Sequence, residues 1–394
     1  MWRGFSLRTL ALLLVGPLLF DMLSVCFLFW MNLQSVRMGV PPWMQALIPA
    51  LYALAYVVGA QLSGRTVTPK SAQWLVLLMC PAMTALGIVA VVVLSFPLYL
   101  VLGFAIGIAT GFYFTPFQVA MGDVRPFRTL AWTIGFYNIS WGTGCTLAPF
   151  VIWLKGCSGA AVAVVVGVLA LVNTALALSA RTAPRRPADE SHMTVGFVST
   201  GVQRLTSRIA AGLANGLTTG LSSTLWLALG DARGLNNRQI ALGVAVMGLP
   251  VVALAPLWAW QRRRLIRPRV MIALMLLLAA AYVPVLYVPW PAALAPLALV
   301  GVCGSGLYFH GIYYANADPR SNARNVGAYE SCVGLGALLG PLLLGLVAWT
   351  DKTSLRPFLV GALIMAAVAV LVICLHARDA RQRTVDVDSS CPKA

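Results

Sequence analysis

The stretch GAYESCVGLGALLGPLLLG at residues 327–345 is a long apolar run that carries a single carboxylate, Glu330, and no lysine or arginine. A charged side chain at the centre of a bilayer helix costs about 2.5–3.5 kcal/mol on insertion scales. A membrane helix that retains such a residue is therefore expected to use it, for a polar contact inside the protein or for function.

A second stretch, GFYNISWGTGCTLAP at residues 135–149, repeats the first at an offset of 192 residues. The offset places Gly135, Tyr137, Gly142, Gly144 and Pro149 on Gly327, Tyr329, Gly334, Gly336 and Pro341. A neighbouring block, at an offset of 195, places Gly111, Tyr113, Phe114, Asp123 and Arg125 on Gly306, Tyr308, Phe309, Asp318 and Arg320. Identities in one order indicate an internal duplication. Asn138 is then the counterpart of Glu330.

The composition is that of a membrane protein, because 60% of the 394 residues are hydrophobic and only 10% are charged, against about 25% charged residues in soluble domains. A bilayer core of about 30 Å needs about 20 apolar residues per helix. Such runs lie near 5–32, 43–62, 73–94, 97–121, 129–154, 158–179, 205–229, 239–260, 270–288, 291–315, 325–349 and 357–376. The alternation of barrel strands is absent. The sequence predicts an all-α polytopic membrane protein with twelve transmembrane helices.

The basic residues predict how these helices are oriented. With the N-terminus in the cytoplasm, the inside segments hold 22 of the 28 lysines and arginines, which is the positive-inside pattern. This pattern explains the net charge of +17 without a nucleic-acid partner. Because the helix count is even, both termini are expected in the cytoplasm of a protein of the cytoplasmic (inner) membrane.

A polar segment with several arginines and prolines divides the chain into two parts. We predict a six-helix bundle at 1–180, a cytoplasmic linker at 181–204, a second six-helix bundle at 205–377 and a cytoplasmic tail at 378–394. The duplication makes the bundles pseudo-symmetric, and parallel halves of this kind describe one transporter architecture.

The chain resembles the major facilitator superfamily in its twelve helices, central linker and parallel repeat. GALLGP at 336–341 resembles the Gly-x-x-x-Gly-Pro element of antiporters in this superfamily, and its copy GCTLAP at 144–149 carries Ala148 in place of the second glycine. GAQLSGR at 59–65 resembles the loop signature of the family with Ser63 at the acidic position. The resemblance implies alternating access between the two bundles and assigns no subfamily.

Only two acidic residues, Asp21 and Glu330, lie well inside predicted helices. Asp21 is about 22 Å along the first run, in a helix that lines the central cavity in the superfamily. A buried carboxylate takes up a proton more readily than one in water. We predict proton coupling or substrate contact for both. The alternatives are a purely structural hydrogen bond for Asp21, and an ion pair with Arg208 or Arg324 for Glu330.

Polar and aromatic residues in the corresponding helices predict a cavity for an amphipathic or ring-bearing solute. They are Tyr113, Gln118, Asn138, Tyr308, His310, Tyr329 and Arg208. The alternative for each aromatic residue is helix packing or the interfacial belt. Arg208 either extends to the membrane surface or pairs with Glu330 or an anionic substrate.

Two further sets complete the predicted site. Charged residues at repeated helix ends resemble the gating charges of the superfamily: Asp123, Arg125, Arg128, Asp318, Arg320 and Arg324. Residues expected to permit close packing or bending are Gly144, Pro149, Gly336, Gly340 and Pro341.

No phosphate-binding loop, zinc-protease motif, catalytic triad or metal-ligand cluster is present in the sequence, so we expect no cofactor and no enzymatic activity. We predict a monomeric secondary transporter of a small organic solute, proton-coupled, with export favoured. The alternatives are a symporter that takes up a metabolite, and a receptor or assembly factor with the same fold. An intramembrane enzyme has the least support.

Overall fold

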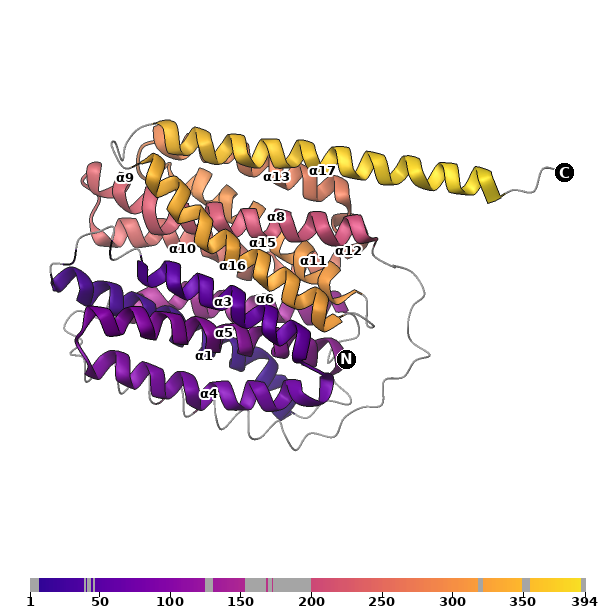
Figure 1. Cartoon of the computed structure of the whole chain (residues 1–394). Coiled ribbons are helices and arrows are strands. Elements are labelled where there is room, and N and C mark those ends of the chain that lie inside the picture. Colours follow the sequence, from indigo (N-terminus) through magenta and orange to yellow (C-terminus); the bar gives the residue numbers. More distant parts are fainter. Residues whose placement is uncertain are drawn as a thin grey trace.

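The computed structural model describes residues 7–38, 40, 44, 47–124, 130–152, 168, 172, 200–317, 322–348 and 355–390. All regular secondary structure within these ranges is helical, and the helices lie side by side in an elongated bundle (Figure 1). The predicted helix at 158–179 and nearly all of the predicted linker at 181–204 lie outside the described residues.

The first part of the chain forms five long helices that correspond to the first five predicted runs. They are α1 (Leu7–Arg37), α3 (Leu47–Thr66), α4 (Pro69–Val92), α5 (Phe96–Val124) and α6 (Leu130–Ile152). Thr68 caps α4, since its hydroxyl accepts a hydrogen bond from the main-chain nitrogen of Ser71 at 3.2 Å. This cap lets α4 begin directly after α3 ends.

The second part contains more numerous and shorter elements. They are α8 (Gly201–Gly220), the π-helix η2 (Leu221–Leu225), α9 (Trp226–Ala232), α10 (Asn237–Ala253), α11 (Ala255–Trp260), α12 (Arg262–Leu265), α13 (Pro268–Tyr282), α14 (Pro284–Tyr287), α15 (Leu294–Asn316), α16 (Asn322–Val347) and α17 (Leu355–Ser390). The predicted run 239–260 is interrupted at Leu254, where Pro250 and Pro256 each lack an amide hydrogen for the helical ladder. Run 205–229 contains the π turn of η2.

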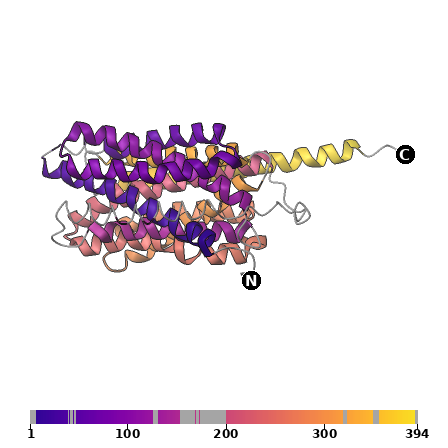
Figure 2. The same ribbon diagram turned by 90° about the horizontal axis from the view of Figure 1, so that it is seen from below.

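Helix α17 is longer than the predicted run 357–376, because it continues to Ser390. The added residues include several charged side chains and no glycine or proline, so helical structure is favoured there even without an apolar environment. Figure 2 shows this C-terminal part of α17 extending beyond the rest of the bundle. The predicted tail at 378–394 is therefore helical over its described part.

The helices pack in two groups that correspond to the two predicted bundles. Within the first group, α1 contacts α6, and α5 contacts α3 and α4. In the second group, α8 contacts α15, α16 and α17, while α13 contacts α15 and α17. The groups meet where α16 lies against α3 and α5, and where α6 lies against α10, α11 and α15. The predicted bundle boundaries remain a prediction.

Eight helices of the described part are long and apolar enough to cross a membrane, and the protein is a multi-pass membrane protein. The twelve-helix count remains consistent with this number. Several arginines mark the end of the bundle at which α3 ends, α12 lies and α16 begins: Arg65, Arg204, Arg262, Arg263, Arg264 and Arg324. We refer to it as the basic end, which lies on the right of Figure 1 with α12. We predict that it faces the cytoplasm.

Candidate functional site

Glu330 of α16 connects the two helix groups. Its Oε2 accepts a hydrogen bond from the hydroxyl of Tyr56 in α3, and its Oε1 accepts one from Nε2 of Gln118 in α5. The side chain is only 5% exposed. The carboxylate of one group is therefore held by two donors of the other group, inside the protein.

The partners of Glu330 form a small polar cluster. Nε2 of Gln118 also lies 2.9 Å from the hydroxyl of Tyr137 in α6, so four helices contribute side chains. Among the described residues, no arginine pairs with Glu330. Nη2 of Arg208 instead donates to Oδ1 of Asn325 at 2.6 Å. The predicted alternative of an ion pair between Glu330 and Arg208 is thus not the arrangement found here.

Asp21 of α1 lies inside the first helix group and is 8% exposed. The thiol of Cys145 in α6 donates to its Oδ2 at 2.6 Å. The hydroxyl of Ser24 donates to the main-chain oxygen of Asp21 at 2.9 Å and lies 3.5 Å from its Oδ1. Both of these side-chain partners are uncharged, so neither of them compensates the charge of the carboxylate.

Gly144 explains how α6 comes close enough for this contact. A Cβ atom on Gly144 would overlap the main-chain oxygen of Leu18 in α1. Because glycine has no side chain, the two helix backbones approach closely at this point. The next residue, Cys145, then reaches Asp21 across the α1–α6 contact.

A second contact between the helix groups joins two aromatic rings. The ring of Trp141 in α6 meets that of Tyr308 in α15 edge-on, with centroids 5.6 Å apart. Nε1 of Trp141 donates to Oδ1 of Asn138 at 3.1 Å, and the hydroxyl of Tyr308 donates to Oδ1 of Asn215 in α8. Polar atoms thus flank an aromatic contact at the interface between the groups, an environment suited to a ring-bearing solute.

Three predicted cavity residues pack instead within their own helix group. Tyr113 is fully buried and stacks on Phe20, with centroids 3.7 Å apart. The ring of Tyr329 covers Gly311 of α15. His310 is fully buried, with its ring 6.1 Å from that of Tyr314. The surroundings of these three residues are those expected for helix packing, the alternative to a cavity role.

Most of the predicted gating charges cannot be placed. Arg125, Arg128, Asp318 and Arg320 lie outside the described residues, and of Asp123 only the backbone, in α5, is described. Arg324 is exposed in α16 at the basic end. The gating role therefore remains a prediction.

The predicted packing residues lie at close helix contacts. A Cβ on Gly336 would overlap the main-chain oxygen of Gly212 in α8, and one on Gly340 would overlap that of Gly216. Pro341 lies within α16, which continues as a helix past it. Of Pro149 the structure describes the backbone alone, near the end of α6.

Several site residues were not among the predicted ones: Tyr56, Trp141, Cys145 and Asn215. The sequence offers a signal for Asn215. It lies in α8, which is less apolar than the other long helices of the second part if the charged end of α17 is set aside, and a polar membrane helix is a candidate lining of a site. Tyr56 follows Tyr52 by four residues, and the two rings stack 6.4 Å apart. Nothing in the sequence distinguishes the thiol of Cys145 from those of other apolar cysteines.

Comparison with known proteins places this geometry in a known fold. Residues 207–389 match the family model described as Major Facilitator Superfamily. No curated protein sequence matches the chain.

Among solved structures, the chain is similar to the human organic anion transporter MFSD10 (TETRAN). The TM-score is 0.70 with 16% identity, over 94% of this chain and 100% of that chain. It is also similar to a variant of the E. coli fucose:proton symporter FucP. There the TM-score is 0.65 with 13% identity, over 93% of this chain and 98% of that chain. These likenesses show the fold over nearly the whole chain. The chain thus has the fold of these two transporters, and its residues 207–389 resemble the Major Facilitator Superfamily.

Proposed function

We propose that the protein is a secondary transporter that moves a small organic solute across the cytoplasmic membrane by alternating access, coupled to protons. The observation that carries this proposal is the bridge from Glu330 to Tyr56 and Gln118. It joins the two helix groups near the basic end, so a cavity can open there only when the bridge breaks.

Protonation of Glu330 supplies the coupling in this proposal. An ionised carboxylate accepts charge-assisted hydrogen bonds from Tyr56 and Gln118, and these are roughly twice as strong as bonds between neutral groups. A proton on Glu330 therefore weakens the bridge and favours separation of α16 from α3 and α5. A ligand shifts a two-state equilibrium only through its different affinity for the two states, and here the proton is that ligand.

Asp21 is proposed as the second titrating group, inside the first helix group. The side chains that bond to it among the described residues, Cys145 and Ser24, are neutral, so a proton or a cationic group of the solute can satisfy its charge. Asp21 also lies within electrostatic range of Glu330. Protonation of one carboxylate therefore changes the affinity of the other site for a cation.

The proposed solute is amphipathic or ring-bearing, and neutral or cationic. Trp141 and Tyr308 offer aromatic surface, while Asn138 and Asn215 offer hydrogen bonds beside it. A cation is attracted to aromatic faces and to carboxylates. The organic anions named for the human structural relative are the less suitable class at a site with two carboxylates. Fucose, named for the bacterial relative, is uncharged and serves as a second reference compound.

Export is the proposed direction, based on the resemblance of residues 336–341 to the Gly-x-x-x-Gly-Pro element of antiporters. A symporter that takes up a metabolite would use the same bridge, but the proton and the solute would cross the membrane in the same direction. The two differ in the sign of the solute-driven proton flux, so one experiment separates them.

The test uses protein reconstituted in liposomes with a pH-sensitive dye inside. A panel of organic cations, neutral ring compounds, sugars and organic anions is added outside, and the internal pH is followed. Antiport predicts that an outside solute drives protons out of the liposome, and symport predicts that it drives them in. No proton movement with any solute would contradict proton-coupled transport and favour a receptor or assembly factor.

A further inference from the structure

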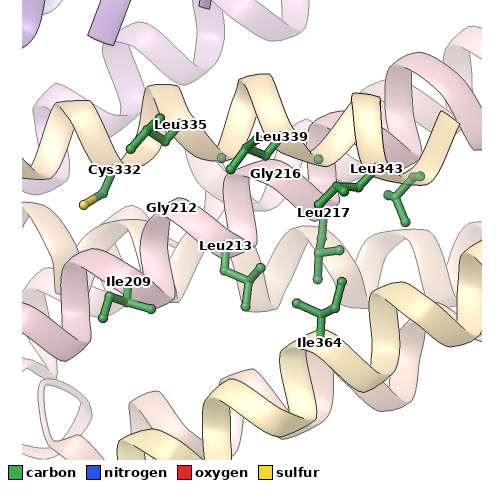
Figure 3. Close-up of a pocket in the computed structure, with 13 residues that line it drawn as sticks. Ile209, Gly212, Leu213, Gly216, Leu217, Cys332, Leu335, Leu339, Leu343 and Ile364 are labelled. Atoms are coloured by element: carbon green, nitrogen blue, oxygen red, sulfur yellow. The ribbon is translucent and has the colours of Figure 1, made fainter. Parts of the chain in front are cut away.

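An apolar groove lies on the side of the second helix group, away from the site between the groups. Residues of α8, α16 and α17 line a cavity of about 250 Å³ without polar surface. Its floor is the contact of Gly212 and Gly216 with Gly336 and Gly340, where two backbones touch. Figure 3 shows the groove between α16 and α17, with Ile364 of α17 opposite Leu217 of α8.

The groove opens toward the lipid side of the bundle. Leu335 and Leu339 on its α16 wall are 42% and 48% exposed, in a helix apolar and long enough to span the membrane. The hydrocarbon core of a bilayer contains no water to fill such a space. Lipid tails are therefore the material available to occupy it.

The shape of the groove suits a single acyl chain. The lining residues of α16 extend from Cys332 to Leu344, a length of about 18 Å at 1.5 Å per residue. The volume is smaller than the roughly 300–1,000 Å³ of pockets that enclose a whole drug-sized ligand. A long and narrow ligand therefore fits the space better than a compact one.

Positive charge lies where a head group would be. Arg208 precedes the groove residue Ile209 in α8, and its guanidinium is within electrostatic range of Cys332, the first groove residue of α16. Two more arginines, Arg204 and Arg324, lie within range of Arg208. Arg208 donates a hydrogen bond to the neutral Oδ1 of Asn325. The basic end of the groove thus attracts an anion.

Contacts between α17 and α8 hold the groove open. Nε2 of His376 lies 3.1 Å from the hydroxyl of Thr206, which fixes α17 to α8 near the basic end. Farther along, Gly361 of α17 packs against Leu217 of α8. Because both helices that flank the groove are anchored on α8, its walls are preformed, and a bound chain loses less freedom than on a mobile surface.

We propose that this groove binds one acyl chain of an anionic phospholipid of the bilayer, with the phosphate at Arg208, Arg204 and Arg324. The site is separate from the bridge of Glu330. Its occupant packs on α16, the helix that carries Glu330, so the lipid stabilises α16 against α8 during the proposed transport cycle.

The test is native mass spectrometry of the purified protein after incubation with phosphatidylglycerol or phosphatidylethanolamine with identical chains. We expect the wild-type protein to retain phosphatidylglycerol preferentially, as one bound molecule. Leu339→Trp fills the groove and should remove that bound lipid. Arg208→Gln leaves the groove open and should lower phosphatidylglycerol binding about fivefold, the contribution of one arginine near a charged membrane surface, with little change for phosphatidylethanolamine.

The matched control is Leu346→Trp, which adds the same ring to α16 at a residue that is 64% exposed and does not line the groove. This variant should retain phosphatidylglycerol like the wild-type protein. Equal lipid retention by Leu339→Trp and Leu346→Trp would overturn the acyl-chain site. Equal retention of the two lipids by the wild-type protein would overturn the anionic head group. Neither result depends on the proposed transport activity.

Discussion

Helices α6 and α16 are two copies of one sequence segment, and they share their glycines but not their polar contacts. Gly144 of α6 lies against the backbone of α1, and its counterpart Gly336 of α16 lies against the backbone of α8. Asn138 bonds within its own helix, to Trp141. At the corresponding position, Glu330 bonds across to α3 and α5.

This difference separates the glycines, which serve helix packing in both copies, from the polar position, which we propose serves function in one copy. The glycines are required in both copies because each copy packs on an equivalent helix of its own group. The polar position is free to differ, since only one copy has to hold the other group. The duplication gave both copies the same glycine contacts. One changed residue, Asn in one half and Glu in the other, accounts for the hydrogen-bonded bridge of Glu330 to α3 and α5.

The largest expected effect comes from breaking the shared scaffold. Gly336→Leu and Gly144→Leu each place side-chain atoms on a neighbouring main-chain oxygen, a collision more severe than ordinary core overpacking of about 1–3 kcal/mol. Neither variant should give a folded, monodisperse protein in size-exclusion chromatography. Gly201→Leu is the control, because no atom lies within 4 Å of a Cβ there. Normal folding of either scaffold variant would contradict the helix contacts described.

The next effect comes from making the two copies more alike. Glu330→Gln keeps the shape of the side chain and removes its charge and its titration. Proton-driven accumulation of solute in liposomes should fall at least about tenfold, as expected when a charge-assisted hydrogen bond worth about 1.5–3 kcal/mol is lost. Asn138→Ala, in the other copy, should have a smaller effect on accumulation. Full coupling in Glu330→Gln, or a larger loss in Asn138→Ala, would reverse the assignment.

A smaller effect is expected from removing one donor of the bridge. Tyr56→Phe leaves the ring and deletes the hydroxyl that binds Glu330. Hydrogen bonds between membrane helices contribute about 1–2 kcal/mol in model peptides, so the form open at the basic end should become about 5- to 30-fold more populated. Thiol labelling of a cysteine introduced at Ser331, a residue buried against α3, measures this population in protein whose native cysteines have been replaced. Tyr52→Phe, one turn away, is the control and should not change the labelling rate.

The smallest effect is expected from removing one hydrogen-bond donor of Asp21, the carboxylate that lies within one half. Cys145→Ala removes the thiol donor of Asp21, which is a weak hydrogen-bond donor, and leaves the bridge between halves intact. Coupled transport should therefore fall less than about threefold, below the effect of an ordinary hydrogen bond of about 1 kcal/mol. Asp21→Asn, measured beside it, should abolish coupling. A loss as large as that of Asp21→Asn in Cys145→Ala would make the thiol part of the coupling site.

The sequence was sufficient to predict the helical membrane fold and the duplication, because hydrophobic runs and repeated glycines are local signals. It also pointed to Asp21 and Glu330, since charges are rare in apolar helices. It did not identify Tyr56, Cys145 or Asn215 as partners, because partners from distant helices are set by packing. The repeat also led to predictions of cavity residues that pack inside their own helix groups: Tyr113 and Tyr329 are repeated positions, yet they contact Phe20 and Gly311 of their own groups.

The bridge of Glu330 is tested most directly by a distance between the helix groups at the basic end. Spin labels are attached at Thr66→Cys, at the end of α3, and Arg264→Cys, in α12, both exposed residues, with the native cysteines replaced. Pulsed electron paramagnetic resonance should give one short distance for otherwise unchanged protein at high pH. With Glu330→Gln added, a second and longer distance should appear, because more of the protein is open at the basic end. Identical distance distributions with and without Glu330→Gln would contradict the account.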